Sequence, residues 1–162
     1  MKLYLDTSAL VKLYVEEEGS ATVREAIARA DTVATPVIAY VEACAAFARR
    51  RREGRLSRGD YRRTIQDLES DRDHYLLLEV TSELIRRAAD LTAIYPLRAY
   101  DAMHLASAKV LQERLQGPIF FACWDSNLSA GAKREGLSLV PARYNPDGRP
   151  FVKTDFRPVI GG

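Results

Sequence analysis

The chain alternates short apolar runs with longer segments in which apolar residues recur every three or four positions. Short continuous apolar runs are typical of buried strands, and the longer period is typical of helices with one buried face. We predict strands over residues 2–5, 32–34, 75–80, 119–123 and 138–140. We predict helices over residues 9–15, 20–30, 36–53, 57–73, 81–95, 99–115 and 126–135. Strands that alternate with helices favour an α/β fold with a parallel sheet covered on both faces.

Several helix boundaries carry local signals. Thr35 followed by Pro36 is typical of a helix start, with a capping hydroxyl and then proline at the first helical position. Ser57 with Asp60 resembles a capping box, and Gly54 closes the helix before it. After residue 143 the chain holds several Pro and Gly and no clear period. We therefore predict one domain over residues 1–143 and an irregular tail over residues 144–162.

Length and composition describe an ordinary globular protein. The 162 residues fit a single domain, and the contents of 47% apolar and 28% charged residues are common for this class. The N-terminus lacks the pattern of a signal peptide, and charged residues interrupt every long apolar stretch, so we expect no membrane span. Cys44 and Cys123 each lie in an apolar pattern, which favours buried free thiols in a reducing cytoplasm.

Four acidic residues stand where solvated charges are unusual. Asp6 and Asp125 each follow an apolar run predicted to be a strand, and open α/β sheets bind their ligands at the carboxyl ends of strands. Glu42 shares a predicted helix face with apolar neighbours, and Asp101 lies near a predicted helix N-terminus. If the four converge, they form an oxygen-rich pocket that suits a hard divalent cation such as Mg²⁺ or Mn²⁺.

Each acid also has a simpler interpretation. Asp6 and Asp125 can cap the helices that follow them, Asp101 can be a plain first-turn residue, and Glu42 can pair with an arginine at the helix edge. The combination of two strand ends with two inward helix positions is the stronger signal. Setting the four charges aside raises the formal net charge from +2 to +6, a basic body around an acidic centre that suits a polyanionic substrate.

The motifs around these acids resemble those of the PIN domain, and more closely those of VapC-type toxins of bacterial and archaeal toxin–antitoxin pairs. The resemblance covers about residues 1–142. It rests on the order and spacing of the isolated Glu42 and three strings: Leu5-Asp6-Thr7-Ser8-Ala9-Leu10-Val11-Lys12, Tyr100-Asp101-Ala102-Met103-His104-Leu105-Ala106 and Trp124-Asp125-Ser126-Asn127-Leu128.

The resemblance implies a three-layer α/β/α fold with a five-stranded parallel sheet. It also implies an Mg²⁺-dependent endoribonuclease, commonly a homodimer, that is neutralised by a cognate antitoxin protein. By position, Asp6, Glu42, Asp101 and Asp125 match the acidic quartet of the family, and Asp6 and Asp101 match its direct metal ligands. The preference for RNA over DNA comes from the resemblance and not from the residues themselves.

One position departs from the family pattern. Members often carry Thr or Ser two residues before the fourth acid, and this chain has Cys123 there. A thiol is a weaker hydrogen-bonding group than a hydroxyl. We therefore expect Ser8 or Ser126 to take over that contact.

The densest basic stretch of the chain comprises eight arginines between residues 49 and 63. Three interpretations are open: contact with RNA phosphates, contact with an acidic antitoxin segment, or a solvated rim. Glu42 and Arg49 are seven residues apart on one helix face, so we expect Arg49 and Arg52 to guide RNA towards the quartet. His104 lies three residues after Asp101, and the simplest interpretation of a lone helical histidine is structural.

Three other functions fit less well. A phosphate-accepting receiver domain needs an acidic pair near the first strand and a lysine near the last, and neither is clear. A haloacid-dehalogenase-type phosphatase needs a second aspartate two residues after the first, where this chain has Ser8. A PIN-like RNA-binding module without catalysis is the alternative, although the complete quartet argues against it.

Overall fold

The five strands form one parallel sheet in the order β3-β2-β1-β4-β5, in a computed structural model that describes residues 1–140. The strands are β1 (Lys2–Leu5), β2 (Thr32–Pro36), β3 (Leu76–Leu78), β4 (Ile119–Ala122) and β5 (Ser138–Val140). The helices are α1 (Thr7–Tyr14), α2 (Ser20–Ala28), α3 (Ile38–Arg52), α4 (Arg58–Asp71), α5 (Ser82–Ile94), α6 (Ala99–Arg114) and α7 (Ser126–Arg134), with a 3₁₀ turn η1 (Arg72–His74). The predicted fold class is confirmed.

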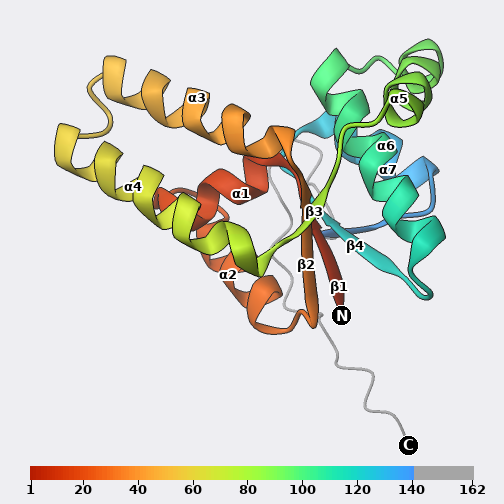
Figure 1. Ribbon diagram of the computed structural model, residues 1–162, viewed down its shortest axis with the longest axis horizontal. Coiled ribbons are helices and arrows are strands. Elements are labelled where there is room, and N and C mark those ends of the chain that lie inside the picture. The colour runs from red at the N-terminus through yellow and green to blue at the C-terminus, as the bar shows by residue number, and fades with distance from the viewer. Residues whose placement is uncertain (141–162) are drawn as a thin grey trace, which may run out of the picture.

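Helices cover both faces of the sheet, which gives three layers. Helices α1 to α4 lie on one face and α5 to α7 on the other (Figure 1). The central strand β1 shows why: Leu3 and Leu5 belong to the core beneath α1 to α4, whereas Tyr4 packs in the opposite core with Phe121. Alternate residues of a strand point to opposite faces, so a fully apolar strand is buried on both.

The strand order reverses direction at β1. The chain first adds β2 and β3 on one side of β1, and then crosses to add β4 and β5 on the other. Leu5 is in register with Ala122, so the carboxyl ends of β1 and β4 lie side by side. In open α/β sheets, the crevice at such a reversal is where ligands bind. The residues that follow Leu5 and Ala122 therefore lie at this crevice.

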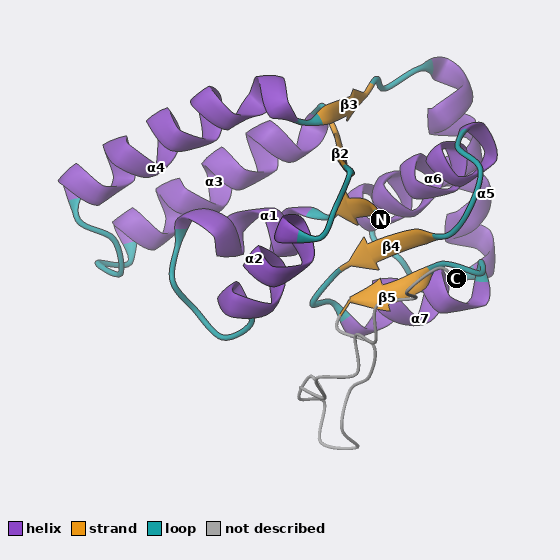
Figure 2. Ribbon diagram, turned by 90° about the horizontal axis from the view of Figure 1, so that it is seen from below, coloured by secondary structure: helices purple, strands orange, loops and turns teal. Residues whose placement is uncertain are grey.

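Helices α3 and α4 form a long antiparallel pair that extends away from the sheet (Figure 2). Gly54, predicted to close the helix before it, lies in the turn between them with φ of 71°. The Ser57 hydroxyl accepts a hydrogen bond from the backbone N–H of Asp60, at 3.0 Å, and so caps α4.

The predicted helix start at Thr35 and Pro36 is wrong. Both residues belong to β2, and α3 begins at Ile38 after Val37. The buried Thr35 hydroxyl donates to the carbonyl oxygen of Leu5, at 2.9 Å, instead of capping a helix. Pro36 is the last residue of β2 and is in register with Leu78, and the next backbone N–H, that of Val37, donates to the carbonyl oxygen of Leu78 at 3.0 Å. A tertiary contact therefore overrides the local capping signal.

The other boundaries agree with the prediction to within a few residues, and β3 covers residues 76–78 of the predicted 75–80. The predicted tail over residues 144–162 lies outside the described residues, so the division at residue 143 stays a prediction. Within residues 1–140, no helix is long and apolar enough to span a bilayer. Cys44 is partly buried and Cys123 is buried, both as free thiols.

Candidate functional site

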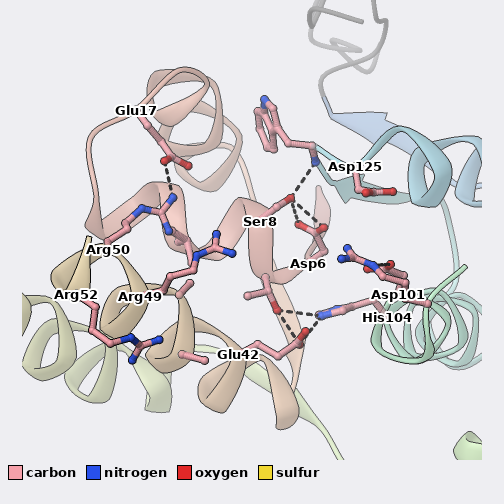
Figure 3. Close-up of a pocket in the computed structure, with 16 residues that line it drawn as sticks. Asp6, Ser8, Glu17, Glu42, Arg49, Arg50, Arg52, Asp101, His104 and Asp125 are labelled. Carbon is pink, nitrogen blue, oxygen red and sulfur yellow. Dashed lines mark hydrogen bonds and ion pairs between the residues drawn. The ribbon is translucent and has the colours of Figure 1, made fainter. Parts of the chain in front are cut away.

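All four predicted acids line one pocket at the carboxyl ends of the strands, with a volume of about 660 Å³. Asp6 follows β1, Glu42 lies on α3, Asp101 lies in the first turn of α6, and Asp125 precedes α7. Four different elements thus supply the four carboxylates (Figure 3). The simpler interpretations also hold for three of them, because Asp6 caps α1, Asp125 caps α7 and Asp101 is a first-turn residue of α6.

Asp6 is the most buried of the four, with 4% of the residue exposed. Its Oδ1 accepts the backbone N–H of Ala9, at 2.8 Å, and both carboxylate oxygens accept the Ser8 hydroxyl, at 2.7 and 2.9 Å. Burial raises the pKa of Asp6 above its ordinary value, although the nearby His104 and these hydrogen bonds oppose the shift. A charged Asp6 therefore needs more positive charge nearby than the surrounding hydrogen bonds provide.

Glu42 is held by a hydrogen-bonded network that includes a buried histidine. Its Oε2 accepts the Thr7 hydroxyl at 2.7 Å and lies 2.9 Å from Nε2 of His104. Nδ1 of His104 lies 3.1 Å from the hydroxyl of Tyr4, at the centre of the sheet. Burial works to raise the pKa of Glu42, but the bonds from His104 and Thr7 outweigh it and hold that pKa below its usual value. Glu42 is therefore kept ionised.

His104 is a structural residue, as predicted, and it is also part of the site. The side chain is 2% exposed, so the structural interpretation is correct as far as burial goes. The same ring nevertheless lines the pocket and contacts one of the four acids. If Nε2 carries the proton and donates to Glu42, Nδ1 is left to accept from Tyr4, so a neutral ring satisfies both contacts.

Asp101 is paired with Arg98, which was not among the predicted site residues. Nε of Arg98 donates to Oδ2 of Asp101 at 2.9 Å, and Arg98 also lines the pocket. The hydrogen bond to Asp101 is the largest cause of a raised pKa for Arg98, with smaller contributions from Asp125 and Glu42. The Arg98 side chain is 82% exposed, so the pair is weak and open to exchange. The spacing of three residues on one helix turn was the signal that could have revealed it.

The loop before Asp125 is held by contacts from both Cys123 and Ser8. The backbone N–H of Asp125 donates to the Cys123 sulfur, at 3.2 Å, so the thiol keeps the local contact. Ser8 acts elsewhere: its hydroxyl accepts the backbone N–H of Trp124, at 2.9 Å, while it donates to Asp6. Ser8 therefore ties the ends of β1 and β4 together, and Ser126 is exposed.

The opposite side of the pocket is basic. Arg49, Arg50 and Arg52, all from the last turns of α3, line it (Figure 3). Arg50 is committed to an ion pair with Glu17, at 2.7 Å, and Glu17 also pairs with Lys12, at 2.8 Å. The ion pair between Glu17 and Arg50 had no local signal, because the two residues are 33 positions apart in the chain.

The chemistry of the four acids suits a hard divalent cation, since all their donor atoms are carboxylate oxygens. Within residues 1–140, however, no three His, Cys, Asp or Glu side chains are gathered closely enough to hold a metal ion. The contacts above explain this spacing, because Glu42 is turned to His104 and Asp101 to Arg98. The four acids fit the ligand preference of Mg²⁺ or Mn²⁺, but their carboxylates do not converge on one point.

Comparison with protein families gives a match to the PIN domain, over residues 3–115. The chain is also 31% identical over 148 residues to two proteins of Mycobacterium tuberculosis: Ribonuclease VapC45 of strain CDC 1551 / Oshkosh and Ribonuclease VapC49 of strain ATCC 25618 / H37Rv. Each alignment covers 89% of this chain and 98% of the relative.

Three solved structures share the fold. A toxin–antitoxin complex from Klebsiella pneumoniae matches with a TM-score of 0.57 at 17% identity, and covers 81% of this chain and 92% of the other. VapBC2 from Rickettsia felis, bound to a DNA fragment from its promoter, matches with a TM-score of 0.59 at 12% identity, over 86% and 97% of the two chains. FitAcB from Neisseria gonorrhoeae matches with a TM-score of 0.56 at 14% identity, over 85% and 95%. At these identities the likeness establishes the fold.

Proposed function

Because the chain belongs to the PIN domain family, and to its VapC type, we propose that it is a metal-dependent endoribonuclease and the toxin of a type II toxin–antitoxin pair. The observation that carries the proposal is the shared pocket of Asp6, Glu42, Asp101 and Asp125 at the strand-order reversal. The near full-length alignment to two proteins named ribonuclease supports hydrolysis of RNA phosphodiester bonds.

We assign Asp6 and Asp101 as the direct ligands of Mg²⁺, with Mn²⁺ as a substitute. When bound, the ion supplies the Lewis acidity that activates water and offsets charge on the phosphoryl oxygens. The raised pKa of Asp6 supports its assignment, because a buried carboxylate without enough positive charge gains most from a cation. The exposed Arg98 is the group that Asp101 would exchange for the ion.

Glu42 and Asp125 complete the catalytic quartet. Oε2 of Glu42 is occupied by Thr7 and His104, and among residues 1–140 no hydrogen bond reaches its Oε1. An ionised carboxylate with one committed and one available oxygen is suited to orient a water molecule and accept its proton. Asp125 lines the same pocket, with Oδ1 occupied by the N–H of Leu128.

The partners follow from the same family membership. The proposed partners are an RNA substrate, a cognate antitoxin and a second copy of the chain. An antitoxin would neutralise the acidic half of the pocket with a basic side chain, and an arginine fork suits a carboxylate best. Arg98 already makes a contact of this kind within the chain, through its Nε to Asp101.

A PIN-like RNA-binding module without catalysis is the alternative, and the open arrangement of the four acids among residues 1–140 favours it. Incubating the pure protein with a mixed RNA pool decides between the two. We expect cleavage with Mg²⁺, none with EDTA, and none with the Asp101→Asn or Asp6→Asn protein at any Mg²⁺ concentration. Full cleavage by purified Asp6→Asn protein would defeat the metal assignment, and RNA binding without any cleavage would establish the alternative.

A further inference from the structure

We infer that Arg49 and Arg52 form a two-site phosphate track for single-stranded RNA, which leads from the end of α3 to the four acids. The inference rests on the proposed function. It assigns the surface that binds RNA, which the proposed function does not specify. The pocket that holds the acids also holds these two arginines, so one continuous surface joins the positive and negative halves.

The track lies along one face of α3. Glu42, Ala45, Ala46, Arg49 and Arg52 all line the pocket, at helix offsets of zero, three, four, seven and ten residues. Residues at such offsets share one helix face. The face thus begins with an acid, continues over two small side chains, and ends with two arginines. Arg49 is about 10 Å from Glu42 along the axis and Arg52 about 15 Å, so the two can meet successive phosphates upstream or downstream of the scissile bond.

The neighbouring arginines are used differently. Arg50 is buried against Glu17, with 13% of its side chain exposed, and its charge is already paired. Arg51 lies over the ring of Tyr61, at 5.3 Å, and is not part of the pocket. In contrast, the Arg49 side chain is 63% exposed with only a loose contact to Glu53, at 3.9 Å. Among residues 1–140, no ion pair or hydrogen bond engages the side chain of Arg52.

Charge explains why such a track is needed. RNA is a polyanion, and four carboxylates in the pocket repel it. Phosphate contacts beside the acids offset that repulsion without reading the sequence of bases. An acidic segment of a protein partner would also be attracted to Arg49 and Arg52. However, it would gain nothing from a surface that runs into four carboxylates, whereas an RNA strand must reach them to be cleaved.

The test measures binding and salt dependence apart from cleavage. The full chain is titrated against a fluorescein-labelled single-stranded RNA of mixed sequence in EDTA, over a range of NaCl concentrations. The Arg49→Gln/Arg52→Gln protein is compared with Arg51→Gln/Arg55→Gln, which loses the same charge from the α3–α4 end outside the pocket. Circular dichroism and thermal melting establish that both variants are folded.

We expect the Arg49→Gln/Arg52→Gln protein to bind about tenfold more weakly at low salt. The slope of log affinity against log salt should become shallower by about 1.4, because each phosphate contact on a single strand contributes about 0.7. The control variant should keep the wild-type slope. In Mg²⁺, KM should rise for the track variant while kcat changes little.

An unchanged slope, an equal loss in the control, or no RNA binding by the wild type overturns the track. An unchanged slope in a protein that still cleaves RNA with Mg²⁺ leaves the proposed nuclease in place and removes only this inference. A reduced slope in a chain that never cleaves RNA keeps the track and removes the nuclease. Loss of binding to an acidic antitoxin peptide with unchanged RNA binding assigns the two arginines to the protein partner instead.

Discussion

Asp6 combines two demands that conflict in a protein without bound metal. Its carboxylate caps α1 and accepts the Ser8 hydroxyl, which requires an oxygen acceptor at that place. It is also almost completely buried, which disfavours its charge. An asparagine in the same place keeps the acceptor and loses the charge, and it caps helices as well as aspartate does.

We therefore predict that Asp6→Asn stabilises the metal-free protein at pH 7. Because the folded state raises the pKa of Asp6, its ionisation favours the unfolded chain. This penalty is absent below the ordinary aspartate pKa of about 3.9 and grows as pH rises through the raised value. In EDTA, the melting temperature should rise by about 2–4 °C for each kcal/mol of this ionisation penalty that is removed. The gain should shrink towards pH 4, and an equal gain at both pH values would contradict the explanation.

The contact between His104 and Glu42 gives a second prediction at this scale. Replacing His104 with Leu removes the largest group that lowers the pKa of Glu42, so that pKa should rise. If ionised Glu42 is required, the acid limb of the cleavage profile moves to higher pH. Tyr4→Phe is the matched control, because it removes the far partner of the ring and leaves the bond to Glu42 intact.

Both variants should lose stability, by about 1–3 kcal/mol for a buried polar group left unpaired. Only His104→Leu should move the pH profile, which separates positioning of Glu42 from general support of the fold. A pH limb that shifts equally in the two variants would mean that the ring acts through packing alone.

The four acids could be found from sequence because their signals are local. Asp6 and Asp125 follow apolar runs, and Glu42 and Asp101 interrupt helical patterns of small and apolar residues. Their surroundings could not be found in the same way. Tyr4 and His104 are 100 residues apart, and the hydroxyl of Ser8 bonds to a backbone N–H 116 residues away. Such contacts depend on the strand order, which no local pattern encodes.

At the scale of elements, the turn between α1 and α2 is fastened to the loop that carries Asp125. Gly19 is the N-cap residue of α2, with φ of 91°, and a Cβ there would lie 2.7 Å from the ring of Trp124. Lys12 lies on the same ring, at 5.0 Å from its centroid. The absence of a side chain at Gly19 therefore lets the indole pack closely beside one of the four acids.

We predict that Gly19→Ala lowers the free energy of unfolding by more than the strain of its left-handed backbone alone. Gly54→Ala is the control, because Gly54 also has positive φ but a Cβ added there would meet no atom within 4 Å. Left-handed backbone should cost each variant about 1–2 kcal/mol. Overpacking against Trp124 should add about 1–3 kcal/mol at Gly19 alone. Urea unfolding measures both, and equal losses would show that the ring simply moves away.

The boundaries of elements were less predictable than their existence. The start of α3 is the clearest case, because a threonine followed by a proline is an ordinary capping signal. The hydroxyl of Thr35 instead bridges β2 to β1, and α3 begins three residues later, at Ile38. Sheet formation decides how that hydroxyl is used, so the local signal could not reveal it.

At the scale of the whole molecule, the proposed function requires one pocket to serve both an RNA strand and an antitoxin. We predict that Ala45→Trp or Ala46→Trp blocks antitoxin binding, because both residues line the pocket between the acids and the arginines. The partner to use is the cognate antitoxin that the proposed function requires. Co-expression and affinity capture should show loss of the complex while the melting temperature changes little, since Ala45 is exposed and Ala46 is only partly buried. Undiminished capture by both variants would place the antitoxin elsewhere.

The central place of β1 has a consequence for how the protein is made. β1 ends at Leu5, yet its neighbour β4 begins only at Ile119, so the ribosome completes one strand long before the other. Asp6 and Asp125 therefore cannot meet until synthesis has passed β4. At about 5–20 residues per second, this delay is on the order of ten seconds. A nascent chain released before residue 125 carries Asp6 but no Asp125, so under the proposed function such a truncated product lacks part of the catalytic quartet.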